Sequence, residues 1–82
     1  MSFEISYQAL GVRRSEKNES KTKALEKAIK LEKDGCIIMN ISAVYSNKFS
    51  ALVWDNFSGV TLQEMLEKEL VRKPTVLNTI MR

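Results

Sequence analysis

Few residues of this chain could carry out chemistry. There is no histidine among its 82 residues, so the commonest general base and the commonest metal ligand are both missing. Cys36 is the only cysteine, which excludes an internal disulfide, and its Ile and Met neighbours predict a small core side chain. The carboxylates mostly lie beside lysines, as on a solvated charged surface, and they lack the spacing of a calcium loop. The three glycines are isolated, so no phosphate-binding loop is indicated. We therefore expect no catalytic site, no metal and no cofactor.

Length and composition predict one small domain, residues 1–82. The chain is 44% hydrophobic and 28% charged, which is ordinary for a folded domain. Its longest apolar run, residues 36–39, is far shorter than a membrane helix. The N-terminal residues lack a basic region followed by an apolar stretch, so we expect no secretory signal. With a single free thiol, this favours a cytoplasmic location.

The first half of the chain predicts a strand and a helix. Residues 2–10 alternate, with an apolar side that includes Phe3, Ile5 and Tyr7, as in a strand with one buried face. Residues 12–20 are polar and are interpreted as a loop or a frayed continuation of that strand. Residues 20–34 have helical periodicity, with Ser20 as N-cap and a glycine just beyond the end.

The second half predicts a hairpin and another helix. Residues 36–46 and 48–56 are rich in apolar and β-branched residues and flank a turn at Asn47. Thr61 and Glu64 have capping-box spacing, so a helix begins there, and it ends near Lys73 because Pro74 follows. Residues 75–82 are interpreted as a short edge strand, with a short helix or a tail as alternatives.

This order of elements, βαββα(β), predicts a ferredoxin-like α+β fold with both helices on one face of an antiparallel sheet. In that fold the strand over residues 36–46 lies at an edge. It contains no charge and no proline, the residues that usually protect an edge from pairing with another chain. Such an edge favours pairing with a partner protein or with a second copy. A twisted hairpin, or a covering loop, is the alternative.

The register of the hairpin decides whether Trp54, the only tryptophan, lies in the core. A two-residue turn at 46–47 places Ile41 opposite Leu52 and puts Trp54 in the core. A three-residue turn at 46–48 places Ala43 opposite Ala51 and turns Trp54 to the opposite face. The second alternative separates polar from apolar side chains better, although it needs a left-handed residue that Lys48 does not favour. We favour the three-residue turn and an outward Trp54.

These patterns predict a non-enzymatic protein-binding or self-associating module, of adaptor, inhibitor or regulator type, with a homodimer as one form. Exposed aromatic side chains are typical anchors of such interfaces. The predicted contact residues lie on one face of the hairpin: Ile38, Asn40, Ser42, Val44, Leu52 and Trp54.

The alternative function is nucleic-acid binding. The net charge is +3, and basic residues concentrate between residues 13 and 33, where a phosphate backbone could be attracted. The interleaved Glu19 and Glu26 equally suit a solvated helix. The candidate contacts are Arg13, Arg14, Lys17, Lys23, Lys27 and Lys30.

Overall fold

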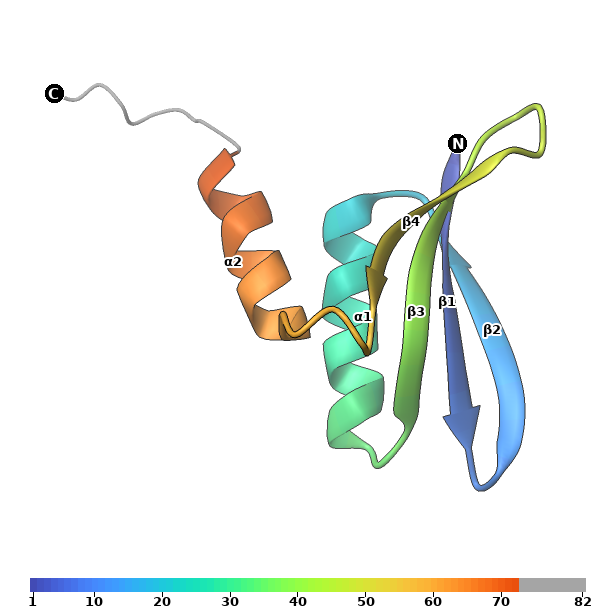
Figure 1. Ribbon diagram of the computed structural model, residues 1–82, viewed down its shortest axis with the longest axis vertical. Helices are drawn as coiled ribbons and strands as arrows, with labels where there is room; N and C mark the ends of the chain where they lie inside the picture. The colour runs from blue at the N-terminus through green and yellow to red at the C-terminus, as the bar shows by residue number, and fades with distance from the viewer. Residues whose placement is uncertain (73–82) are drawn as a thin grey trace, which may run out of the picture.

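The structure is a computed structural model that describes residues 1–72, without the side chain of Arg72. It contains four strands and two helices in the order ββαββα (Figure 1). The elements are β1 (Ser2–Ala9), β2 (Val12–Asn18), α1 (Lys21–Lys33), β3 (Ile37–Val44), β4 (Ser50–Asp55) and α2 (Leu62–Arg72). The predicted strand over residues 75–82, with its alternatives, lies outside the described residues.

The segment interpreted as a loop after the first strand is in fact a strand. β2 pairs antiparallel with β1 over its whole length, from Ala9↔Val12 to Phe3↔Asn18. The two residues between them, Leu10 and Gly11, have φ values of 53° and 78°. Positive φ at both positions is what a two-residue type I′ turn requires. The prediction missed this turn because leucine rarely adopts positive φ and because β2 lacks an apolar face.

The sheet is antiparallel and open, with the strand order β2-β1-β3-β4. The α+β class is therefore confirmed, but the ferredoxin-like order is not, because a helix lies between β2 and β3 and β1 forms a hairpin with β2. β3 pairs with β1 on one side and with β4 on the other. The prediction that this strand lies at an edge is wrong. The edges of the described sheet are β2 and β4.

Both helices begin at the predicted caps. The Ser20 side chain accepts a hydrogen bond from the backbone N–H of Lys23 at 3.1 Å, and Gly35 follows α1 with φ of 97°. At α2, the Glu64 carboxylate accepts from the backbone N–H of Thr61 at 2.9 Å, and the Thr61 hydroxyl accepts from the N–H of Glu64 at 3.1 Å. Each reciprocal bond satisfies a donor that the first helical turn leaves free.

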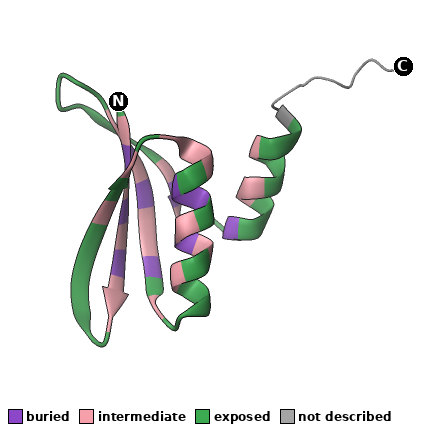
Figure 2. Ribbon diagram, turned by 180° about the vertical axis from the view of Figure 1, so that it is seen from behind, coloured by how far each residue is buried: buried purple, intermediate pink, exposed green. Residues whose placement is uncertain are grey.

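The core lies between one face of the sheet and α1. Phe3, Ile5 and Tyr7 alternate along β1 as predicted, and they pack against the buried face of α1. α2 packs on α1, and its first residue, Leu62, is part of the same core. Figures 1 and 2 show α2 beside α1, on the side away from β2. Both helices thus lie on one side of the sheet, and we call the other side the open face.

An ion pair adds to the contact between the helices. Lys21 Nζ of α1 lies 3.4 Å from a carboxylate oxygen of Glu69 in α2. Within residues 1–72, neither helix is long and apolar enough to span a lipid bilayer.

Candidate functional site

The turn between β3 and β4 has three residues, as favoured from the sequence. The backbone N–H of Tyr45 donates to the carbonyl of Phe49 at 2.8 Å, and the N–H of Lys48 donates to the carbonyl of Tyr45 at 2.9 Å. Lys48 adopts the left-handed conformation, with φ of 68°. The Asn47 side chain helps to fix the turn, because its oxygen accepts from the N–H of Phe49 at 3.1 Å. This bonding matches a type I turn closed by one left-handed residue.

Trp54 nevertheless lies in the core, so its predicted outward orientation is wrong. Next to the turn the register is the expected one, with Ala43 opposite Ala51. The ladder then shifts by one residue, so that Ile41 pairs with Trp54 and Val53 is left without an opposite residue. A bulge of this kind returns the next side chain to the other face. Only 7% of the Trp54 surface is exposed.

Trp54 has a structural role that the sequence did not indicate. Its indole Nε1–H donates to the carbonyl of Val60 at 2.6 Å. That bond ties the loop after β4 to the core, one residue before the Thr61 cap of α2. The indole therefore helps to set the position at which α2 begins.

Ile38 is also buried, with 3% of its surface exposed, and its predicted place among the contact residues is wrong. The reason is a second register shift, in the β1–β3 ladder. Ser6 pairs with Asn40, but Tyr7 pairs with Ile38, which leaves Met39 without an opposite residue. Ile38 consequently faces the core beside Tyr7.

The other four predicted contact residues share the open face. Ser42 pairs with Leu52 across the hairpin, and with the half-exposed Glu4 of β1 on its other side. Leu52 is 61% exposed, whereas Asn40, Ser42 and Val44 are partly buried. The open face is thus polar with an apolar side chain at Leu52, close to β4.

The sequence did not identify two exposed aromatic residues at the end of the hairpin. Tyr45 and Phe49 lie opposite each other at the turn, and Tyr45 follows the buried Ala43 at a spacing of two residues, so it points to the same face of the sheet. They are, however, 43% and 71% exposed. The reason is visible in Figure 1, where the end of the β3–β4 hairpin extends beyond α1 and the helix does not cover it. An apolar strip therefore continues the core face into solvent.

The two edges of the sheet differ in charge. β2 carries Arg13, Arg14 and Lys17, all exposed, which is a common protection against strand pairing. From Phe49 to Trp54, β4 and the residue before it carry no charge and no proline. We call the side of β4 that faces away from β3 the β4 edge. The β4 edge thus has the uncharged, proline-free composition that favours pairing, which the sequence had indicated for residues 36–46 in β3.

The backbone of the β4 edge has groups available for pairing. In an antiparallel ladder, alternate residues direct both backbone groups to the same neighbour. The backbone carbonyl of Phe49 accepts a hydrogen bond from the Tyr45 N–H, so the backbone groups of Phe49 face β3. The alternating residues Ser50 and Leu52 therefore direct their N–H and C=O groups away from β3. Both residues are exposed, and within residues 1–72 no strand pairs with this side of β4.

The predicted basic residues are divided between the two faces. Arg13 and Lys17 lie opposite Gln8 and Glu4, on the open face, whereas Arg14 lies opposite Tyr7, on the helix side. Lys23 and Lys30 are exposed on α1. Lys27 points toward β2, since its Nζ lies 3.8 Å from a carboxylate oxygen of Glu16.

Glu16 lies within the basic group of the helix side and reduces its net charge. Its carboxylate accepts a 3.4 Å hydrogen bond from the Tyr7 hydroxyl in addition to the Lys27 contact. Burial of the hydroxyl and the nearby Glu16 charge raise the pKa of Tyr7 above its usual value. Tyr7, Glu16 and Lys27 therefore form a bonded group in which the carboxylate holds β2 against α1.

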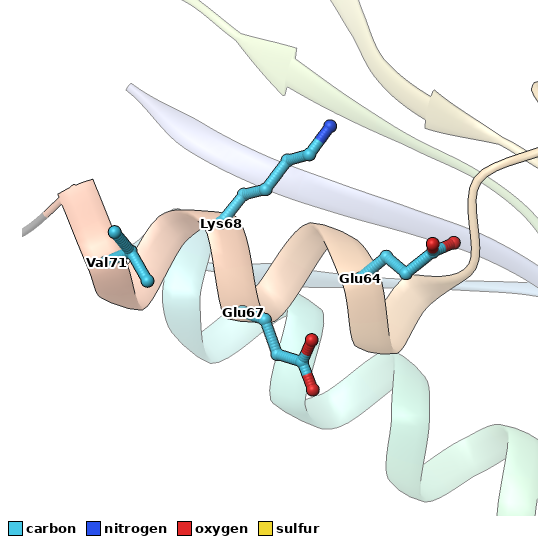
Figure 3. Close-up of a pocket in the computed structure, with 4 residues that line it drawn as sticks. All are labelled: Glu64, Glu67, Lys68 and Val71. Atoms are coloured by element: carbon cyan, nitrogen blue, oxygen red, sulfur yellow. The ribbon is translucent and has the colours of Figure 1, made fainter.

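Neither of two hollows on the described surface brings together side chains that could act in catalysis. One, of about 530 Å³, lies where α1 ends and α2 begins, and contacts Cys36, Trp54 and Asn56. The other, of about 480 Å³, is lined by Glu64, Glu67, Lys68 and Val71 of α2. In Figure 3 the Glu67 and Lys68 side chains point to opposite sides of the helix, so they do not converge on a ligand. Within residues 1–72, no three metal-ligating side chains of the His, Cys, Asp or Glu type come together.

Similarity to known proteins does not add to this picture. Comparison with models of protein families, with curated proteins and with solved structures finds no match. The β4 edge, with the apolar side chains beside it, is accordingly the candidate functional site on its own geometry.

Proposed function

We propose that this chain is a non-enzymatic protein-binding module of adaptor, inhibitor or regulator type, and that its partner adds a strand to the β4 edge. The observation that carries the proposal is the difference between the two edges. β2 is protected by three cations, whereas the Phe49–Trp54 stretch is uncharged and directs backbone donors and acceptors into solvent.

The side chains beside the edge suit such a partner. Leu52 offers an apolar contact on the open face, and Phe49 offers one on the helix side. Added strands obtain affinity from main-chain hydrogen bonds and specificity from side chains on alternate faces. The predicted contact residues Asn40, Ser42 and Val44 adjoin Leu52 and extend this surface over the open face.

A photo-crosslinking experiment tests the proposal in cells of the source organism. A photoreactive phenylalanine analogue replaces Phe49, and the same analogue replaces Leu10 as a control. Leu10 is a fully exposed residue in the turn of the other hairpin. We expect crosslinked polypeptide from position 49 and little from position 10. Equal yields from the two positions, or no polypeptide from position 49, would refute binding at the β4 edge.

A second candidate function is nucleic-acid binding by the basic residues of β2 and α1. The favouring observation is that the fold brings Arg14 of β2 to the side of the sheet on which the lysines of α1 lie. Its test is fluorescence polarisation with labelled RNA and DNA at two salt concentrations. Binding that weakens steeply with salt, and that Arg14→Glu reduces, supports it. Salt-insensitive binding, or none, removes it.

A further inference from the structure

We propose that the strand added to the β4 edge is the β4 edge of a second copy of this chain, paired antiparallel about a two-fold axis at Ala51. The inference rests on the proposed function and names its partner. A two-fold axis brings the same surface of both copies together, and an antiparallel strand pair satisfies that symmetry.

The backbone phase of β4 determines the register. Only Ser50 and Leu52 direct both backbone groups outward within the regular part of the strand, which extends from the left-handed Lys48 to the bulge at Val53. An axis at Ala51 places Ser50 opposite Leu52 of the second copy, and Leu52 opposite its Ser50. Both pairs then have the hydrogen-bonded geometry, so the register supplies four backbone bonds.

The neighbouring register is less favourable. An axis at Ser50 pairs that residue with its own copy and supplies two bonds. Its next hydrogen-bonded pair would join Leu52 to Lys48, whose φ of 68° lies outside strand geometry. The register at Ala51 is therefore preferred.

Charge also favours this pairing. Between Phe49 and Trp54 no charged residue meets its own copy. Beyond that stretch, the register places Lys48 opposite Trp54 of the second copy, so that no two like charges face each other at either end of the pair. A two-fold pairing of the β2 edges about Ser15 would instead place Arg13 opposite Lys17 of the second copy at both ends of the pair, and like charges across strands are unfavourable.

The available surface indicates a weak dimer. Tyr45 and Phe49 together expose roughly 200 Å² of aromatic surface, if a full aromatic side chain contributes about 150–250 Å². A stable interface needs about 800 Å² on each partner. Leu52 and the backbone of β4 add to the aromatic area without reaching a large interface. We therefore expect a dissociation constant on the order of micromolar.

A charge exchange at Ala51 tests the inference. This residue faces its own copy across the proposed axis, and it is exposed in the single chain, so Ala51→Lys and Ala51→Glu are compatible with the fold. Sedimentation velocity over a concentration series gives the dissociation constant of each protein. We expect the dissociation constant to increase at least tenfold for either variant alone, since two like charges then meet at position 51 across the axis. An equimolar mixture of the two variants should recover dimers, because the lysine of one copy then meets the glutamate of the other.

The control variant is Ser15→Lys, which adds the same charge to the exposed β2 edge and should leave the dissociation constant unchanged.

Several outcomes would overturn the inference. The inference is wrong if the wild-type protein is a monomer at all concentrations, or if neither Ala51 variant changes the dissociation constant. It is also wrong if the equimolar mixture of variants does not form dimers. A series of ever larger assemblies, as β2-to-β4 pairing would produce, likewise contradicts it. The crosslink at position 49 separates this inference from the proposed function. A product with another polypeptide alone would reject the second copy and retain binding at the β4 edge, whereas no product would reject both.

Discussion

Replacing Trp54 with phenylalanine tests whether the indole is a core residue that positions α2. The substitution removes the 2.6 Å hydrogen bond from Nε1–H to the carbonyl of Val60 and part of the buried ring. The Val60 carbonyl keeps a 3.4 Å hydrogen bond from the Ser58 hydroxyl, so the lost indole bond costs about 0.5–1.5 kcal/mol, and the lost ring volume adds to that. We expect the free energy of unfolding to fall by about 2–3 kcal/mol. A chain of this length has about 4–12 kcal/mol in total, so the variant remains folded.

The measurement is urea unfolding followed by far-UV circular dichroism, which does not depend on tryptophan. With an m-value near 1 kcal/mol/M, the urea midpoint should decrease by about 2–3 M. Dilute samples are needed, because self-association would add concentration-dependent stability.

The matched control is Phe57→Leu, three residues along the chain. The Phe57 side chain is exposed, and only its backbone N–H is bonded, to Asp55 Oδ1 at 2.9 Å. Its stability should stay within about 0.5 kcal/mol of the wild type. An unchanged midpoint for Trp54→Phe, or an equal decrease for Phe57→Leu, would show that the buried position of the indole has been misjudged.

Three further predictions concern the turn of the first hairpin, the cap of α2 and Tyr7. Leu10→Asn should raise the thermal midpoint, with a gain of about 1 kcal/mol, because Leu10 is exposed and holds a positive φ that asparagine tolerates better; a lower midpoint would contradict the turn. Thr61→Ala should cost about 1 kcal/mol in urea unfolding. In the wild type, the hydrogen bonds from Thr61 lower the pKa of the Glu64 carboxyl. The stability that Glu64 contributes should therefore be present above the ordinary carboxyl pKa and be lost as the pH falls through the lowered pKa. Because the pKa of Tyr7 is raised in the folded state, its contribution to the free energy of unfolding is fully present below the ordinary tyrosine pKa near 10 and decreases as the pH rises above it. Tyr7→Phe should abolish this part of the stability loss at alkaline pH, as measured by circular dichroism against pH.

Local sequence signals were sufficient for the helices and for the first strand. Ser20, Thr61 and Glu64 predicted the caps that the hydrogen bonds confirm, because capping involves residues three positions apart and needs no distant partner. The alternation along β1 predicted its buried face for the same reason: neighbouring positions in a strand point to opposite sides.

The hairpin shows where sequence reasoning was only partly sufficient. The three-residue turn was predicted correctly from the polarity of the two strands, and Asn40, Ser42, Val44 and Leu52 lie on the expected face. Beyond the turn, however, bulges at Val53 and Met39 reversed the orientation of Trp54 and Ile38. A bulge inserts one residue into a period-two pattern, and an apolar run such as residues 36–39 contains no polar residue that would reveal the shift.

The sequence by itself determined the α+β composition, the positions of both helices, the turn of the second hairpin and the existence of a long uncharged stretch. That stretch, residues 36–46, forms the central strand β3, and only the tertiary structure decided that the shorter uncharged stretch at Phe49–Trp54 lies at an edge. β2 has no apolar face and was recognisable as a strand only by its pairing with β1, which then occupies the place beside β3. Edge position depends on which strands are neighbours in space. The unprotected edge therefore belongs to β4, and the residues that carry the proposed function are Phe49, Ser50, Ala51 and Leu52 rather than Trp54.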